Sequence, residues 1–277
     1  MDHGLHWGAV LPDFDKWLRN LVAQFTELGQ PWPSARRIVV GSNGTAHEES
    51  LLGLHYPEEP LRYMMLLRVS DEGERELTSL YPMLYSGGHN TAIYQGLEIE
   101  EPWSGWELIT VGDGKLLKVF NPLLPFRDGD YEPGDAYGYS LAGLAYTLRP
   151  VTQERLEMNE ETLALLAEAS GSEEVPQIPE GEQVEITLRG RSFLVGAGEG
   201  QDNYGVRATV EEINWLESEG VTFGQMMVRI PMPGEHWPDL AVMIYASESV
   251  LGTFRPSVGD EVEGLLWLQG IRTDSLL

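Results

Sequence analysis

The feature that most constrains this fold is a succession of short, alternating apolar runs that glycine and proline separate. Gly (31) and Pro (17) together make up 48 of the 277 residues and are spread along the whole chain. Such punctuation favours many short elements joined by turns over long helices. From residue 81 onward the runs have the two-residue period of a half-buried strand. The sequence therefore predicts an α+β fold that is mainly antiparallel β.

The first segment, residues 1–80, is expected to form a small α+β unit with one helix. In residues 13–28, DFDKWLRNLVAQFTEL, apolar residues recur at spacings of three and four, as on one face of a helix. Asp13 can cap the N-terminus of this helix, and Gly29 followed by Pro31 is expected to end it. Three β-strands are then predicted, at residues 36–41, 50–56 and 61–69.

Residues 81–150 are expected to form a first β unit, barrel-like or sandwich-like, with strands at 92–100, 106–111, 115–120 and 136–148. Residues 151–182 differ in composition. From residue 152 they hold nine glutamates and one basic residue, Arg155. We predict an acidic helical linker here, with a short helix at 159–171.

A second β unit, barrel-like or sandwich-like, is predicted for residues 183–277. It consists of further short alternating runs between glycine and proline turns. Its expected strands lie within residues 183–196, 204–216, 223–232, 239–246 and 261–272.

Three stretches resemble one another: GDAYGYSLAG (134–143), GEQVEITLRG (181–190) and GDEVEGLLWLQG (259–270). Each begins with glycine and an acid, alternates, and ends on glycine, which is typical of a turn that leads into a strand. The first two are expected to match most closely, because the third has two extra residues. GDEVEG before a strand also resembles the beginning of a strand in oligonucleotide-binding barrels, a likeness of architecture alone.

The charge of the chain narrows its possible partners. There are 44 acidic and 18 basic residues, which gives a net charge of −26. Such a field repels nucleic-acid phosphates and anionic membrane surfaces, and it attracts basic proteins. We therefore expect no nucleic-acid or membrane partner and consider a basic protein as the partner. The alternative is that the acidity serves solubility or salt adaptation.

Several classes of chemistry have no support in the sequence. There is no cysteine, so disulfides and thiolate chemistry are excluded. No HExxH, GxSxG or SxxK motif is present, and no cofactor is expected. No apolar run is long enough to span a membrane and no basic leader begins the chain, so a cytoplasmic location is expected. The histidines of HGLH (3–6) are expected in a mobile terminus.

The candidate binding residues are aromatic residues in or beside turns. Trp103 and Trp106 lie in EPWSGWEL, and His236 and Trp237 lie in GEHWPDL. Tryptophans in loops can stack on sugars or anchor a protein partner, or they can close the core at the end of a strand. The interpretation as a binding surface is strengthened if both turns lie at the same end of the fold.

A weaker candidate is a cation site in RDGDYEPGD, where Asp128, Asp130 and Asp135 supply oxygen ligands. The order of ligands found in EF-hand loops fails, because Pro133 and Gly134 interrupt it. A solvated turn is the favoured interpretation, and no metal site is predicted.

These observations lead to two main hypotheses. The first is a non-enzymatic acidic protein that binds another macromolecule, as an inhibitor, an immunity-like protein or an accessory subunit. The second is a carbohydrate-active enzyme or sugar-binding protein that uses carboxylates and the loop tryptophans. The absence of a catalytic motif favours the first.

Overall fold

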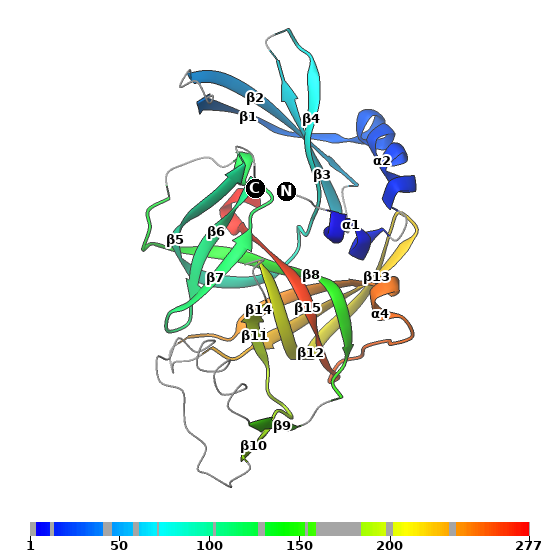
Figure 1. The fold of residues 1–277 in the computed structure, drawn as a ribbon, viewed down its shortest axis with the longest axis vertical. Helices are drawn as coiled ribbons and strands as arrows, with labels where there is room; N and C mark the ends of the chain where they lie inside the picture. The colour runs from blue at the N-terminus through cyan, green and yellow to red at the C-terminus, as the bar shows by residue number, and fades with distance from the viewer. Residues whose placement is uncertain are drawn as a thin grey trace.

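The computed structural model confirms an α+β fold built mainly from antiparallel strands (Figure 1). The strands form a four-stranded, a nine-stranded and a two-stranded sheet. The four-stranded sheet lies at one end of the molecule and the two-stranded sheet at the other. The structure describes residues 4–11, 14–40, 46–57, 61–70, 72–101, 104–126, 131–152, 155–158, 184–197, 202–232 and 237–276.

Two helices precede the first sheet. The predicted helix is present as α2 (Phe14–Leu28), with Leu21 and Phe25 buried on its apolar face. It ends where the N–H of Gly29 donates to the carbonyl of Phe25, at 3.1 Å. A shorter helix, α1 (Gly4–Val10), was not predicted. The expectation that HGLH lies in a mobile terminus is wrong for His6, which is 8% exposed.

The four-stranded sheet is an antiparallel meander in which each strand pairs with the next along the chain. Three of its strands were predicted, and the fourth extends the meander. Tyr63, Met64, Met65 and Leu66 are consecutive and all buried, so both faces of the third strand are covered at that point. The strands are β1 (Gln30–Val40), β2 (Ala46–Tyr56), β3 (Arg62–Val69) and β4 (Arg75–Met83).

The nine-stranded sheet contains strands from both sides of the predicted linker. Its strands are β5 (Gly88–Glu101), β6 (Ser104–Val111), β7 (Lys115–Phe120), β8 (Ala136–Pro150), β11 (Phe193–Gly196), β12 (Asn203–Ser218), β13 (Val221–Ile230), β14 (Leu240–Ser247) and β15 (Glu261–Arg272). The remaining elements are η1 (Leu124–Phe126), β9 (Arg155–Met158), β10 (Val184–Thr187), α4 (Glu248–Leu251) and η2 (Thr273–Leu276). The helix predicted at 159–171 lies outside the described residues.

The nine-stranded sheet closes into two rings that share β8 and β15. In the first ring, β5, β6, β7, β15 and β8 pair in that order, and β8 pairs again with β5. In the second ring, β12, β13, β14, β8 and β15 pair in that order, and β15 pairs again with β12. Each β unit therefore completes its ring with the last long strand of the other.

The shared strands are related by an approximate two-fold axis. Gly143 of β8 lies opposite Leu268 of β15. The two flanking pairs are Ala142–Gln269 and Leu144–Trp267. Adding 125, the difference between 268 and 143, to the β8 number of one pair gives the β15 number of the other pair. The same difference of 125 relates Phe120 to Tyr245 and Leu144 to Gln269. The parallel pair Phe120–Gln269 of β7 and β15 therefore corresponds to the parallel pair Tyr245–Leu144 of β14 and β8. The two β units are thus arranged alike around the β8–β15 pair.

The expectation that the stretches at 134 and 181 match most closely is wrong. Gly134 donates to the carbonyl of Tyr94 at 2.7 Å, and Gly259 donates to that of Val210 at 2.8 Å. The turns before β8 and β15 are therefore equivalent, and the stretch at 259, which was expected to depart, matches the one at 134. In the stretch at 181, the described residues 184–187 form β10, which pairs only with β9 among the described strands.

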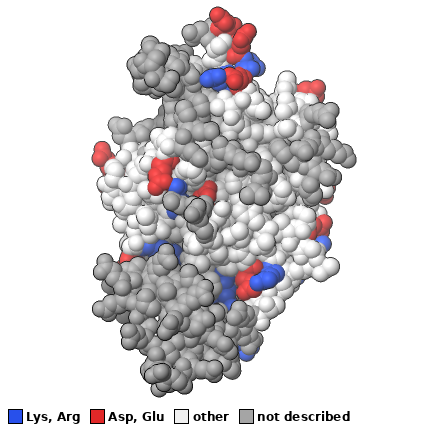
Figure 2. All heavy atoms as spheres, in the orientation of Figure 1, with Lys and Arg blue, Asp and Glu red and all other residues white. Residues whose placement is uncertain are grey.

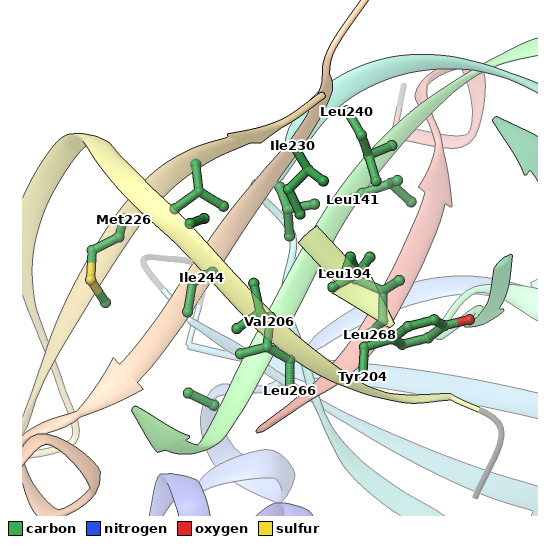
Figure 3. Close-up of a cluster of buried hydrophobic side chains, with 14 of the residues drawn as sticks. Leu141, Leu194, Tyr204, Val206, Met226, Ile230, Leu240, Ile244, Leu266 and Leu268 are labelled. Atoms are coloured by element: carbon green, nitrogen blue, oxygen red, sulfur yellow. The ribbon is translucent and has the colours of Figure 1, made fainter. Parts of the chain in front are cut away.

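Two hydrophobic clusters cover the two faces of the β8–β15 pair. One face, inside both rings, carries an inner cluster that includes Leu141, Val206 and Leu266 (Figure 3). The opposite face carries an outer cluster in which Leu144 and Trp267 pack with side chains of the N-terminal unit. None of the described helices has the length and apolar content needed to cross a membrane. The N-terminal unit thus acts as a cover over the shared strands.

Candidate functional site

The structure does not bring the predicted aromatic candidates together. Trp106, at the start of β6, is half-buried against the outer cluster, whereas Trp237 packs against the inner cluster. Trp103 and His236 lie outside the described residues. Trp106 nevertheless takes part in a buried polar cluster around Asp202, which is the candidate site.

The weak cation candidate gains no support. Asp135 is exposed before β8, and Asp128 and Asp130 lie outside the described residues. Within the described ranges, no three His, Asp or Glu side chains are placed to hold a metal ion.

The centre of the candidate site is the buried carboxylate of Asp202, directly before β12. Its Oδ2 accepts two indole N–H groups, from Trp106 at 2.8 Å and from Trp267 at 2.7 Å. Asp202 is 8% exposed and Trp267 is fully buried. A buried carboxylate needs such donors, because an unpaired charge in an apolar interior is strongly unfavourable. Asp202 therefore joins β6 of the first ring to β15, one of the shared strands.

The N-terminal helix closes over this cluster through His6. The imidazole of His6 stacks on the indole of Trp267, with ring centroids 3.7 Å apart and an angle of 11° between the planes. Its Nδ1 forms a short hydrogen bond with the hydroxyl of Tyr146 on β8. His6, Trp267 and Tyr146 thus link α1 to both shared strands.

Tyr146 occupies a β-bulge. Ala145 pairs with Leu266 and Thr147 pairs with Leu265, so Tyr146 has no partner in β15. The N–H of Leu265 bonds to the Thr147 hydroxyl at 3.1 Å. A bulge adds one residue and re-aims the local side chains, and bulges are common beside functional sites. Here the bulge interrupts the two-fold relation, since the position 125 residues later, Ile271, pairs regularly with Ser140.

A hollow of about 820 Å³ opens next to this bulge. Its walls come from α1, α4, β8, β12 and β15, so all three sequence units contribute. This volume is within the range of small-molecule sites in proteins, about 300–1,000 Å³. Its lining residues include Gly8, Tyr146, Arg149, Asn203, Val250 and Leu265.

The tyrosines in and beside the cluster have raised pKa values. Burial raises the pKa of Tyr146, and the negative charge of Asp202 raises it further. Its hydroxyl therefore keeps its proton at neutral pH and is a hydrogen-bonding group, not a base or nucleophile. Burial likewise raises the pKa of Tyr204, on β12, to about 12. These groups suit the binding of a ligand better than acid–base chemistry.

Acids pair with many of the basic side chains in the described part of the chain. Seven described basic residues form ion pairs with acids: Arg68–Glu76, Lys118–Glu98, Arg149–Glu263, Arg207–Glu261, Arg229–Glu211, Arg255–Glu248 and Arg272–Asp274. Figure 2 shows described acidic side chains scattered over the visible face, several of them beside basic ones, and not gathered in one patch. Exposed carboxylates outside these ion pairs include Glu72, Glu74, Asp113, Glu132, Glu212, Glu217 and Asp239.

Sequence reasoning found one member of this cluster and missed the others. Trp106 was a candidate because it lies beside a turn. Asp202 was not among the candidate residues, and His6 was expected only as part of a mobile terminus. Tyr146 carried no local signal, because its bulge arises from the pairing of two strands that are more than 100 residues apart.

No family model, curated protein sequence or solved structure matches the chain at a significant level.

Proposed function

We propose that this chain is a non-enzymatic acidic protein that binds a basic macromolecule, in the manner of an inhibitor, an immunity-like protein or an accessory subunit. The observation that carries the proposal is the net charge of −26 on a chain in which seven described basic side chains form ion pairs with acids. A field of this size speeds the encounter with a positively charged partner and slows the encounter with anions. A cytoplasmic location belongs to the same proposal.

The bonding of the candidate site favours binding over catalysis. Asp202 Oδ2 already accepts two indole N–H groups, and Tyr146 shares its hydroxyl with His6. A general base must be able to reach a substrate proton, and a nucleophile must be activated by a neighbouring base. These side chains instead hold three parts of the chain together around a hollow.

The strand order of each ring supports an OB-like architecture as part of this proposal. Three consecutive antiparallel strands are followed by a strand that pairs with the first, and a fifth closes the ring parallel to the third. Barrels of this kind bind oligonucleotides and oligosaccharides. The acidic surface makes an oligonucleotide an unsuitable ligand here.

A second candidate function, sugar binding, draws on the hollow beside Tyr146. Its volume of about 820 Å³ can hold a small ring compound, and tyrosine rings stack on sugars. The predicted role of Trp106 in such a site is weakened, because its indole N–H already bonds to Asp202.

The proposal is tested by capture from native lysate at low ionic strength on the immobilised chain. Immobilised polyglutamate of matched charge density serves as the control. We expect a basic protein that is retained by the chain, released by salt and not retained by polyglutamate. Recovery of the same proteins on both supports, or of none, would contradict a specific basic partner.

A further inference from the structure

The second half of β12 has a strand edge with no neighbour among the described strands. β15 pairs with β12 only as far as Thr209, and β11 pairs with it only as far as Arg207. Beyond the bulge at Glu211, residues 212–218 pair with β13 alone. This β12 edge, residues 212–218, therefore presents backbone N–H and C=O groups to which a further strand can bond.

The ladder with β13 determines which backbone groups of the β12 edge face outward. The two strands join through the two-residue turn Glu219–Gly220, where both residues have positive φ, 52° and 74°. The pair that flanks such a turn, Ser218–Val221, exchanges backbone hydrogen bonds, and bonded pairs then alternate along the ladder. The N–H and C=O groups of Glu217, Trp215 and Ile213 therefore point away from β13.

An exposed aromatic side chain, Trp215, lies in the middle of the β12 edge. It is 41% exposed. Its cross-strand partner is Gly224, where an added Cβ would lie 3.5 Å from the Trp215 ring, so the indole reaches over β13. The guanidinium of Arg255 lies 5.4 Å from the centroid of the same ring. The indole is thus positioned by its neighbours while much of it stays accessible, and tryptophan is enriched among the residues that dominate protein interfaces.

The charges along the β12 edge are acidic on both faces of the strand. Glu212 and Glu217 are exposed, lie on opposite faces because side chains alternate, and form no ion pair with a described residue. Glu211, at the bulge, is paired with Arg229 at 2.9 Å. A strand that carries lysine or arginine side chains would meet an acid on either face, and opposite charges across a ladder stabilise the pairing.

Other strand edges in the described part of the chain differ in charge. In the first ring, β5 beyond Ile93 likewise pairs with β6 alone, but its Glu98 is paired with Lys118. The edge of the four-stranded sheet, on β4, carries the exposed cation Arg75. A second copy of the chain is an unfavourable occupant of the β12 edge, because it brings the same acids and a net charge of −26.

We propose that the β12 edge binds an extended basic segment of the partner protein, which adds to the β12–β13 hairpin as a further strand. This inference rests on the proposed function and names the surface that holds the partner. The outward backbone groups of Ile213, Trp215 and Glu217 pair with the segment, and Trp215 packs against one of its apolar side chains. Glu212 and Glu217 face its lysines or arginines.

The probes are two blocked peptides with the same number of lysines, acetyl-(Lys-Val)3-Lys-amide and acetyl-(Lys-Pro)3-Lys-amide. Valine suits a strand, whereas proline has no N–H and cannot join a ladder between two strands. Calorimetry at low salt measures the binding of each peptide to the full chain. We expect the lysine–valine peptide to bind at least tenfold more tightly than the lysine–proline peptide.

Amide hydrogen exchange of the full chain, followed by NMR, reports the added strand directly. In the free chain the N–H groups of Ile213, Trp215 and Glu217 should exchange quickly, whereas those of Asn214 and Leu216 bond to β13 and exchange slowly. Saturation with the lysine–valine peptide should slow exchange of the first three at least tenfold. Attachment through side chains alone would leave their exchange unchanged.

Charge variants locate the binding surface. The double substitution Glu212→Gln and Glu217→Gln should weaken binding of the lysine–valine peptide at least fivefold. The matched control, Glu72→Gln with Glu74→Gln, removes the same charge from two exposed glutamates before β4 and should leave binding within twofold of the parent. All four side chains are exposed, so the substitutions leave the core intact.

The outcomes separate this inference from the proposed function. Equal binding of the two peptides, or binding without protection of the three amides, overturns strand addition and leaves the proposal of a basic partner standing. Equal weakening by the two double substitutions means that overall charge attracts the peptide and that the β12 edge is not the site. If neither peptide binds, the inference fails, and the capture experiment, which does not depend on strand addition, decides the proposed function by itself.

Discussion

The side chain of Asn90 on β5 bonds to the backbone of Ala241 on β14 as a neighbouring strand would. Its Nδ2 donates to the Ala241 carbonyl and its Oδ1 accepts the Ala241 N–H, both at 2.8 Å. The two strands meet end to end here, because β5 and then β14 pair with successive parts of β8. Asn90 thus satisfies the backbone hydrogen bonds of Ala241 where the two rings meet on this side.

At the other place where the two rings meet, between β12 and β7, a different side chain bonds to the backbone in the same way. The hydroxyl of Tyr204 on β12 accepts the N–H of Lys118 on β7 at 2.8 Å and donates to the carbonyl of Lys118 at 3.2 Å. β12 and β7 pair with successive parts of β15. One side chain at each junction therefore satisfies the backbone where two strands meet without a common ladder.

We expect Asn90→Ala to lower the free energy of unfolding by about 2 kcal/mol. The substitution leaves the N–H and the carbonyl of Ala241, which is 4% exposed, without the bonds that Asn90 supplies. Urea denaturation measures the change. Asn214→Ala, at an exposed asparagine of β12, is the control and should change stability by less than about 0.5 kcal/mol. Equal effects of the two substitutions would contradict this role of Asn90.

A second prediction concerns the buried carboxylate of Glu107 inside the first ring. Its oxygens accept the amide of Asn121 at 2.7 Å and the hydroxyl of Tyr139 at 2.8 Å, and Glu107 has no exposed surface. Tyr139→Phe should destabilise the fold by about 1.5–3 kcal/mol, the usual contribution of a hydrogen bond to a charged group. Chemical denaturation checks the value.

The contribution of that charge can be isolated by a double-mutant cycle. In the background of Glu107→Gln, which removes the charge, Tyr139→Phe should destabilise the fold by less than it does in the parent chain. Strict additivity of the two substitutions would show that the bond to Tyr139 does not depend on the charge of Glu107.

A third prediction is a loss of stability at alkaline pH. Burial raises the pKa values of Tyr63, Tyr81 and Tyr139 above the ordinary value of 10.0. Above pH 10 the unfolded chain releases phenolic protons that the folded chain retains, so the folded state binds more protons and the free energy of unfolding falls as pH rises. The slope is about 1.4 kcal/mol per pH unit for each tyrosine that stays protonated. These contributions are fully present below pH 10.

Denaturation at pH 9, 10 and 11 measures this slope, and Tyr81→Phe provides the comparison. The Tyr81 hydroxyl donates to the carbonyl of Pro122 at 2.6 Å, so the substitution lowers stability at neutral pH. It should also remove the contribution of one proton, about 1.4 kcal/mol per pH unit, from the dependence of the free energy of unfolding on pH above pH 10. An unchanged slope would mean that Tyr81 is not protected in the folded chain.

The fourth prediction follows from the exchange of strands between the two rings. A fragment of residues 184–277 lacks β8, and a fragment of residues 1–158 lacks β15, so neither can close its ring. We expect each fragment to be unfolded alone and the two to assemble when co-expressed. Co-purification and circular dichroism provide the measurement. A cooperative unfolding transition of the isolated 184–277 fragment would contradict the shared-strand arrangement.

The sequence by itself determined the elements whose signals are local. The apolar spacing of α2 and the glycine after it gave the helix, because side chains three and four residues apart share a helix face. The alternation in EVEGLLWLQGIR predicted a strand with the same bounds as β15. The predominance of antiparallel β structure followed from the turns between such runs.

Only the tertiary structure decided which strands share a ring and where a polar cluster forms. The repeated stretches suggested related units. That each ring contains both β8 and β15 depends on pairings between residues more than 100 positions apart, and the local alternation of apolar residues does not specify which strands pair. Asp202, His6 and Tyr146 have ordinary neighbours in the sequence. They become a site because α1 covers the shared strands and because one extra residue in β8 re-aims the ladder beside them.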